Sequence, residues 1–209
     1  KIAECSEQSG KSVLEALNLA GAWQLPLVMV VHNNQWAIST PRSIQCAAET
    51  IAQKAIGAGI EGVVVDGNDI FSVLLAVKEA LAKAYSGKGA TLIEAVTYRL
   101  GDHTTADDAG RYRDAKELKE AWKNEPIKRL RNFLFQEGLW DAQKERDLLE
   151  SVSKEIDFAV QAYLKEPKQK PESMFEYLYE EIPNSLLDQY AEVKYQSFNK
   201  SSYKTKEAV

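Results

Sequence analysis

The stretch Leu25-Pro-Leu-Val-Met-Val-Val-His-Asn-Asn-Gln-Trp-Ala-Ile-Ser-Thr40 decides how this chain folds. Its run from Leu27 to Val31 is short, apolar and rich in β-branched residues, which is typical of a strand buried on both faces of a parallel sheet. The run ends abruptly at His32-Asn33-Asn34. Ligands of open α/β sheets bind beyond the carboxyl ends of the strands, so this tripeptide is a candidate binding segment.

The amide oxygens of this segment are candidate ligands for a hard cation. A neutral amide oxygen suits Mg²⁺ or Ca²⁺, and a nearby main-chain carbonyl can supply a second ligand. The alternative is that Asn33-Asn34 only forms a turn, because asparagine tolerates left-handed backbone and bonds to its own main chain. The spacing of these residues, taken alone, favours the turn.

Helical and strand patterns alternate around this first strand. We expect helices at 12–22, 49–58 and 70–85, strands at 61–65 and 90–97, and an N-cap at Asp69. Such alternation is typical of a parallel sheet whose strands are joined by crossover helices. The predicted fold class is therefore α/β, with this parallel sheet occupying residues 1–113.

The rest of the chain has a helical pattern. We expect helices at 115–123, 127–136, 141–166 and 174–181. Residues 114–190 are therefore interpreted as a helical C-terminal extension. Residues 191–209 are predicted to be a disordered tail.

A polar stretch, Tyr98 to Arg113, follows the last predicted strand. It is longer than most connections, and such loops at the carboxyl end of a strand are usually functional or mobile. It places His103 at the same sheet edge as His32. An imidazole near a diphosphate can donate a hydrogen bond and relay protons near neutral pH, whereas the alternative is an ordinary solvated loop residue.

The adjacent carboxylates Asp107 and Asp108 in this loop have two interpretations. They resemble a metal-binding pair. Neighbouring carboxylates in a loop more often pair with arginines, here Arg99, Arg111 or Arg113, and this pairing predicts an ordered hairpin.

Composition excludes several classes of protein. The 209 residues carry a formal charge of −5, which argues against a nucleic-acid partner because phosphate binding needs clustered Lys and Arg. Cys5 and Cys46 have no paired Cys/His spacing, so a disulfide scaffold or zinc ribbon is excluded and a reducing compartment is indicated. The sequence shows neither a bilayer-spanning run nor a secretory signal, which argues against a membrane partner.

Three separate motifs resemble the α subunit of the thiamine-diphosphate-dependent 2-oxo-acid dehydrogenases, a family that includes pyruvate and branched-chain enzymes. They are residues 32–41, residues 65–69, and residues 98–108 with Arg111-Tyr-Arg113. They occur in the family's order, and the likeness extends from about Val13 to about Tyr190. The resemblance implies an incomplete thiamine-diphosphate-binding fold.

The resemblance also implies site residues. In the family, a motif that begins with Gly-Asp-Gly and ends with Asn-Asn holds Mg²⁺ against the diphosphate. Carried over, Asn34 supplies a side-chain oxygen and Trp36 a main-chain carbonyl to the metal. His103 matches the catalytic loop histidine that contacts the cofactor and assists acyl transfer to lipoyl, and His32 falls where some members bind the diphosphate.

The start of the chain departs from the family pattern. Counted back without gaps, Gly-Asp-Gly should lie at Glu4-Cys5-Ser6, where it is absent. The Cys5 thiol is too soft a ligand to replace a carboxylate on Mg²⁺. We therefore expect a truncated chain whose residues 1–12 are out of register with the family, and weak or absent cofactor binding by this chain alone.

The resemblance implies a decarboxylating dehydrogenase subunit that passes an acyl group to a lipoyl-bearing acyltransferase. The implied partner is a β subunit in a heterotetramer, which contributes the glutamate that activates the cofactor, so one chain is an incomplete enzyme. Pyruvate is the first predicted substrate and 2-oxoisovalerate, a branched-chain 2-oxo acid, is the alternative. A third hypothesis is a non-catalytic remnant that acts only in assembly. The expected location is the bacterial cytoplasm, or the mitochondrial matrix of a eukaryote.

Overall fold

The structure, a computed structural model, describes residues 10–204. The chain divides into two compact units, Lys1–Ala142 and Gln143–Val209. We predicted a boundary after residue 113, and that boundary stays a prediction. Within the first unit, α6 (Pro126–Gln136) packs beside β4 and α4: Arg129 lies 2.7 Å from the Asp66 carboxylate, and the Phe133 and Phe71 rings are 4.9 Å apart.

The first unit is built on a parallel sheet, as predicted. Its strands are β1 (Val28–Asn33), β4 (Glu61–Asp66) and β5 (Thr91–Val96), arranged in the order β1-β5-β4. Among the described residues, β5 is therefore the central strand and β1 lies at an edge. The prediction that the first strand is buried on both faces is wrong, because residues 28–30 remain half-buried while residues 91–95 are buried.

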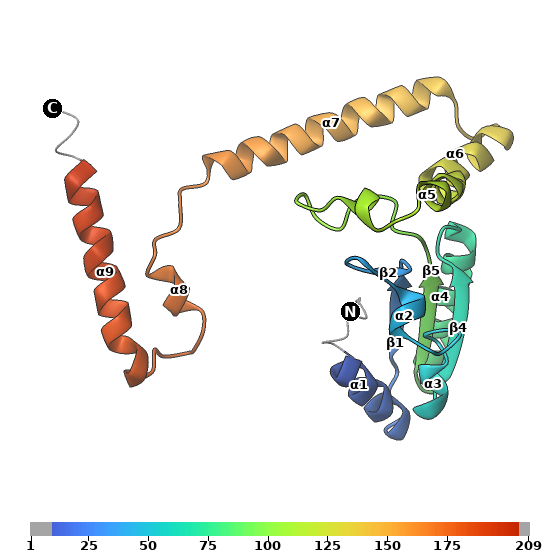
Figure 1. The fold of residues 1–209 in the computed structure, drawn as a ribbon, viewed down its shortest axis with the longest axis horizontal. Coiled ribbons are helices and arrows are strands. Elements are labelled where there is room, and N and C mark those ends of the chain that lie inside the picture. Colours follow the sequence, from blue (N-terminus) through green and yellow to red (C-terminus); the bar gives the residue numbers. More distant parts are fainter. Residues whose placement is uncertain (1–9, 205–209) are drawn as a thin grey trace. The chain divides into compact units, whose positions relative to one another are not determined.

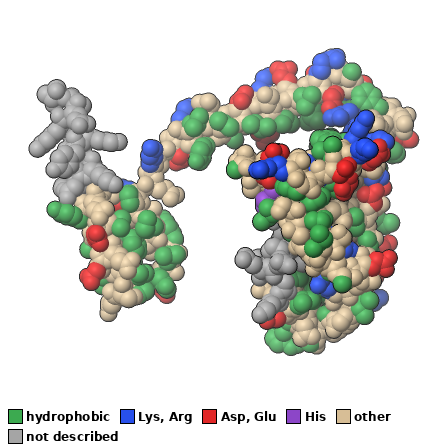
Figure 2. All heavy atoms as spheres, viewed as in Figure 1, with side chains coloured by type: hydrophobic (Ala, Val, Ile, Leu, Met, Phe, Trp, Pro, Cys, Tyr) green, Lys and Arg blue, Asp and Glu red, His purple; other side chains and the backbone are tan. Residues whose placement is uncertain are grey.

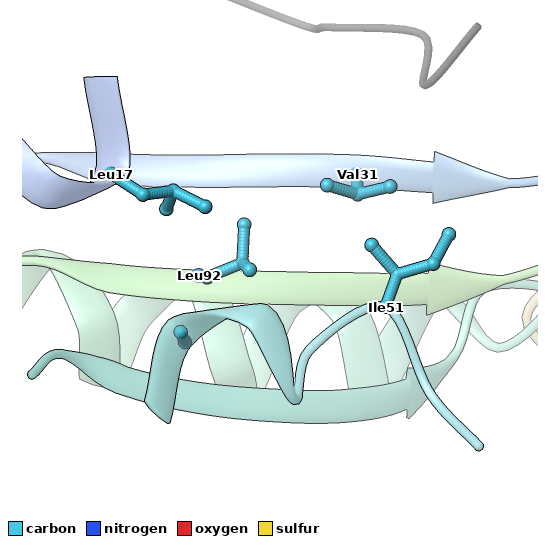
Figure 3. Close-up of a cluster of buried hydrophobic side chains, with 5 residues drawn as sticks. Leu17, Val31, Ile51 and Leu92 are labelled. Carbon is cyan, nitrogen blue, oxygen red and sulfur yellow. The ribbon is translucent and has the colours of Figure 1, made fainter. Parts of the chain in front are cut away.

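Helices cover both faces of this sheet (Figure 1). On one face, α1 (Gly10–Ala22) and the segment around α3 (Lys54–Gly57) pack over a cluster in which Leu17, Ile51 and Leu92 meet (Figure 3). On the other face, α4 (Ile70–Tyr85) packs its alanines against Ile93. Leu92 and Ile93 serve opposite cores because successive strand side chains point to opposite faces.

Local signals in the sequence located α4 correctly and α3 incorrectly. The Asp69 carboxylate accepts a hydrogen bond from the Phe71 amide at 2.9 Å and caps α4, which spans the predicted residues. The expected helix at 49–58 is reduced to α3, because residues 51–53 form turns and the Ala52 amide donates to Glu94 instead of to a helical carbonyl.

Short elements fill the connections. They are β2 (Trp36–Ala37), β3 (Thr40–Pro41), α2 (Arg42–Gln45), the 3₁₀ turns η1 (Ala109–Arg111) and η2 (Trp122–Asn124), and α5 (Ala115–Ala121). β2 and β3 pair antiparallel directly after β1. They form a small hairpin just beyond the carboxyl end of the sheet.

The second unit is helical. It contains α7 (Ala142–Lys165), as expected, then α8 (Ser173–Glu176), shorter than predicted, and α9 (Asn184–Lys204). The prediction of a disordered tail at 191–209 is wrong for residues 191–204, which belong to α9. Residues 205–209 lie outside the described part. The Phe175 side chain is 7% exposed and packs edge-on against Tyr190 at 5.7 Å, which holds α9 to α8.

Apolar side chains gather along one side of α7 (Figure 2). Leu149, Ile156 and Leu164 are 59%, 56% and 67% exposed. Among the helices that the structure describes, none combines the length and apolar character needed to cross a bilayer. Cys46 is a free thiol, whereas Cys5 and the expected Gly-Asp-Gly position at 4–6 lie outside the described residues.

Candidate functional site

The segment Asn33–Trp36, here called the asparagine turn, lies at the carboxyl end of β1. The Asn33 side-chain oxygen accepts a hydrogen bond from the Gln35 amide at 3.1 Å, and the Asn34 oxygen accepts one from the Trp36 amide at 3.0 Å. Gln35 adopts a left-handed conformation with φ 69°. The asparagines therefore do form a turn. An amide oxygen has two lone pairs, so the Asn34 oxygen retains capacity for a second partner.

The two asparagines differ in burial and in partners. Asn33 is 6% exposed and its amide nitrogen donates to the Glu94 carboxylate at 2.6 Å, whereas Asn34 is half-buried. Glu94 was not predicted as a site residue. The signal that identifies it is a lone carboxylate within the apolar run of a central strand, where charged residues are seldom found.

The main chain that follows β5 is joined to the asparagine turn. The amides of Thr97 and Arg99 donate to the carbonyls of Asn33 and Asn34 at 2.8 Å and 3.1 Å. The structure therefore brings the start of the 98–113 loop to the same edge of the sheet as Asn34, as predicted. The Arg99 guanidinium lies 5.9 Å from the Trp36 ring, and it donates to the Ile38 carbonyl at 2.6 Å.

The 98–113 loop is ordered by its own side chains. The Arg113 guanidinium donates to the carbonyls of Arg99 at 2.6 Å, Gly101 at 3.1 Å and Leu100 at 3.2 Å. The Asp102 carboxylate accepts from the Ala109 amide at 3.0 Å. These bonds tie the beginning of the loop to its end.

The expected ordered loop is present, but the expected carboxylate–arginine pairs are not. Among the ion pairs of the described residues, none joins Asp107 or Asp108 to an arginine. Asp107 instead accepts from the Tyr112 hydroxyl at 2.5 Å and from the His103 amide at 2.9 Å, and these bonds lower the pKa of its carboxyl. Asp108 caps η1 through the Gly110 amide. The guanidinium groups of Arg99 and Arg113 donate to main-chain carbonyls instead.

The two histidines lie at this edge with exposed side chains. His32 is in β1 beside Ala95, and His103 is in the loop, where its main-chain amide is held by Asp107. The hydrogen bonds found within the described residues do not join either imidazole to Asn34. The structure thus brings the segments that carry Asn34, Trp36, His32 and His103 to one edge of the sheet without linking their functional groups.

The oxygen atoms at this edge are of the type that hard cations bind. The Asn34 amide oxygen and the Trp36 carbonyl are neutral oxygens, the type that Mg²⁺ accepts. Among the described residues, no three His, Cys, Asp or Glu side chains are grouped so that they could hold a metal ion. The described part of this edge therefore offers neutral oxygen atoms but no cluster of charged ligands.

Comparisons with known proteins agree with the motifs. A family model described as dehydrogenase E1 component matches residues 6–172. Pyruvate dehydrogenase E1 component subunit alpha of Staphylococcus aureus strain Mu50 is 46% identical over 177 residues, which are 84% of this chain and 48% of that protein. The protein of the same name from Staphylococcus epidermidis strain RP62A is 45% identical over the same length.

The chain thus spans about half the length of the curated relatives it matches. The matched family residues include β1, the asparagine turn, β5 and the 98–113 loop. The E1 dehydrogenase family depends on thiamine diphosphate. This chain belongs to the dehydrogenase E1 component family.

Proposed function

We propose that this chain acts in the α subunit of the decarboxylating component of pyruvate dehydrogenase. The reaction is the thiamine-dependent oxidative decarboxylation of pyruvate with acyl transfer to a lipoyl group. The observation that carries the proposal is the junction of two family motifs: the Thr97 and Arg99 amides donate to the carbonyls of Asn33 and Asn34, which joins the turn to the start of the loop. The 46% identity to a pyruvate dehydrogenase subunit favours pyruvate over branched-chain substrates.

In this proposal the Asn34 side-chain oxygen and the Trp36 carbonyl hold Mg²⁺, and His32 donates to the diphosphate. Thiamine diphosphate, when bound, supplies the electron sink for loss of CO₂. His103 is the proposed catalytic residue: its exposed imidazole would contact the bound cofactor and would relay a proton during acyl transfer. Arg113 and Asp107 keep the loop that carries it ordered.

The proposed partners are a β subunit, which completes the active site, and a lipoyl-bearing acyltransferase. The exposed apolar side chains of α7 support a protein partner, because contiguous apolar surface usually marks an interaction site. A bacterial cytoplasmic location is proposed from the staphylococcal relatives.

The decisive experiment is reconstitution. The chain is mixed with the β chain of a related pyruvate dehydrogenase, Mg²⁺ and thiamine diphosphate, and decarboxylation of pyruvate and of 2-oxoisovalerate is measured with an artificial electron acceptor. We expect turnover with pyruvate. Faster turnover with 2-oxoisovalerate would show that the branched-chain acid, and not pyruvate, is the substrate. A stable complex without turnover or cofactor binding would favour a role in assembly only.

A further inference from the structure

Glu94 is a carboxylate buried at the centre of the sheet. Its residue is 1% exposed and lies on β5 between Val31 of β1 and Val64 of β4. A carboxylate buried among apolar neighbours is strongly unfavourable unless hydrogen bonds satisfy it. The contacts that satisfy Glu94 therefore indicate what it does.

Each oxygen of the Glu94 carboxylate holds a different segment. One oxygen accepts from the Asn33 side-chain amide at 2.6 Å, and the other accepts from the Ala52 main-chain amide at 2.8 Å. The carboxylate thus fastens the end of β1 and the segment before α3 to the central strand.

The bond from Asn33 also sets the direction of its amide group. Because the nitrogen of Asn33 must face Glu94, its oxygen faces the Gln35 amide, which donates to it at 3.1 Å. This bond supports Gln35 at φ 69°, a conformation that residues other than glycine seldom adopt. Gln35 in turn lies between Asn34 and Trp36, whose oxygens are the proposed metal ligands.

We propose that Glu94 is a positioning residue of the cofactor site. It orients the Asn33 amide, the Asn33 oxygen fixes the Gln35 backbone, and the asparagine turn then presents the oxygens of Asn34 and Trp36. This inference deepens the proposed function and rests on it where the cofactor is concerned. Residues that orient metal ligands contribute about 10–100-fold to metal affinity in other proteins.

A reciprocal swap tests the proposal. Glu94→Gln turns one carboxylate oxygen, an acceptor, into an N–H donor. Either the Asn33 side-chain amide or the Ala52 main-chain amide then faces a donor where it had an acceptor. Asn33→Asp places two carboxylates face to face. The double variant Asn33→Asp with Glu94→Gln restores every donor–acceptor pair: the new Gln amide donates to the Asp, its oxygen accepts from Ala52, and the second Asp oxygen accepts from Gln35.

Two readouts are taken in the 209-residue chain in complex with the β chain. The first is hydrogen exchange of the Gln35 amide, measured without cofactor. The second is affinity for thiamine diphosphate at saturating Mg²⁺. In each single variant we expect the Gln35 amide hydrogen to exchange faster and the cofactor to bind about 10–100-fold more weakly. In the double variant we expect slow exchange and cofactor affinity to return. The control is Glu61→Gln, which should leave the exchange rate and the affinity unchanged. Glu61 is an exposed glutamate of β4 that pairs with Lys83 at 2.9 Å.

Single variants that only lower the unfolding temperature, with Gln35 exchange and cofactor affinity unchanged, would overturn the proposal. If the single variants do not fold, the double variant decides: renewed protection of Gln35 supports the proposal, and its absence overturns it. If the wild-type complex binds no cofactor, the proposed function fails separately, while exchange of the Gln35 amide still tests whether Glu94 orders the turn.

Discussion

At the scale of single residues, identical side chains have different tasks. Asn33 is 6% exposed; its nitrogen donates to Glu94 and its oxygen accepts from the Gln35 amide, so burial keeps that oxygen from an outside partner. Asn34 is half-buried, and its oxygen accepts from the Trp36 amide with a second lone pair remaining. Only the second asparagine therefore suits a ligand role.

Replacing Asn34 by alanine tests that role. In the complex with a β chain, we expect Asn34→Ala to weaken Mg²⁺-dependent binding of thiamine diphosphate by about 10–100-fold, because one metal ligand is lost. Calorimetric titration measures the affinity. The matched control is Asn68→Ala, in the turn after β4, and an equal loss of affinity in both variants would contradict the assignment.

Asp69 links stability to pH. The pKa of its carboxyl is lowered, first by the hydrogen bond from the Phe71 amide and further by Ser72 and the charge of Arg129. A lowered folded-state pKa means that its contribution to stability is present above the unfolded value of about 4 and is lost as pH falls through the folded pKa.

We therefore expect Asp69→Ala to lower the unfolding temperature at pH 7 more than Asp69→Asn, which retains a capping oxygen. On acidification, the difference between wild type and Asp69→Asn should shrink, since the asparagine does not titrate there. Thermal unfolding followed by circular dichroism at several pH values checks this. A difference that grows with acid would show that the pKa is raised.

At the scale of elements, close approach of the backbone decides where α1 sits. A Cβ added at Gly21 would lie 1.8 Å from the Ala58 carbonyl oxygen. Gly57, in α3, has open space at the same position, since a Cβ there meets nothing within 4 Å. One glycine is required by packing and the other is not.

We expect Gly21→Ala to destabilise the chain by about 1–3 kcal/mol, the usual effect of overpacking. Gly57→Ala is the control and should be neutral or stabilise by a few tenths of a kcal/mol, because alanine favours helix. Urea unfolding measures both free energies. Equal stability of the two variants would mean that α1 and residue 58 do not approach as closely as described.

The 98–113 loop depends on one side chain that spans it. Arg113 donates to three consecutive carbonyls, and lysine lacks the planar fork needed for this pattern. We expect Arg113→Lys to speed hydrogen exchange of the His103 and Ala109 amides, measured by NMR or mass spectrometry. Arg111→Lys, at an exposed neighbour, should leave exchange unchanged. Unchanged exchange in Arg113→Lys would contradict this account.

At the scale of the whole molecule, both apolar cores of the sheet lie in the first unit. Their members, from Val13 to Ile93, all precede the division after Ala142. The second unit has its own small contact, Phe175 on Tyr190. Each unit therefore has internal contacts that do not depend on the other.

We expect a chain shortened to residues 1–142 to keep the cooperative thermal unfolding of the sheet, because it retains α6 and the Arg129–Asp66 ion pair at 2.7 Å. Near-ultraviolet circular dichroism reports this transition. A second chain, shortened to residues 1–113, is the comparison and should unfold at a lower temperature. Equal unfolding of the two would support the predicted boundary after residue 113.

Local patterns in the sequence determined much of the fold. The α/β class, the bounds of α4 and its Asp69 cap follow from periodicity and capping, which act between residues near one another in the chain. The placement of Asn34 and the 98–113 loop at one edge followed from the rule that parallel strands end on the same side. The family motifs supplied the candidate roles of Asn34, Trp36, His32 and His103, which await the tests above.

Only the tertiary structure decided the rest. Strand order made β5 central and left β1 at an edge, α6 packed beside Asp66 and Phe71, and Glu94 joined Asn33 to Ala52. Sequence patterns could not decide these features because each depends on partners far apart in the chain. A local pattern records which side chains need burial or a hydrogen bond, whereas the folded chain determines which distant group satisfies them.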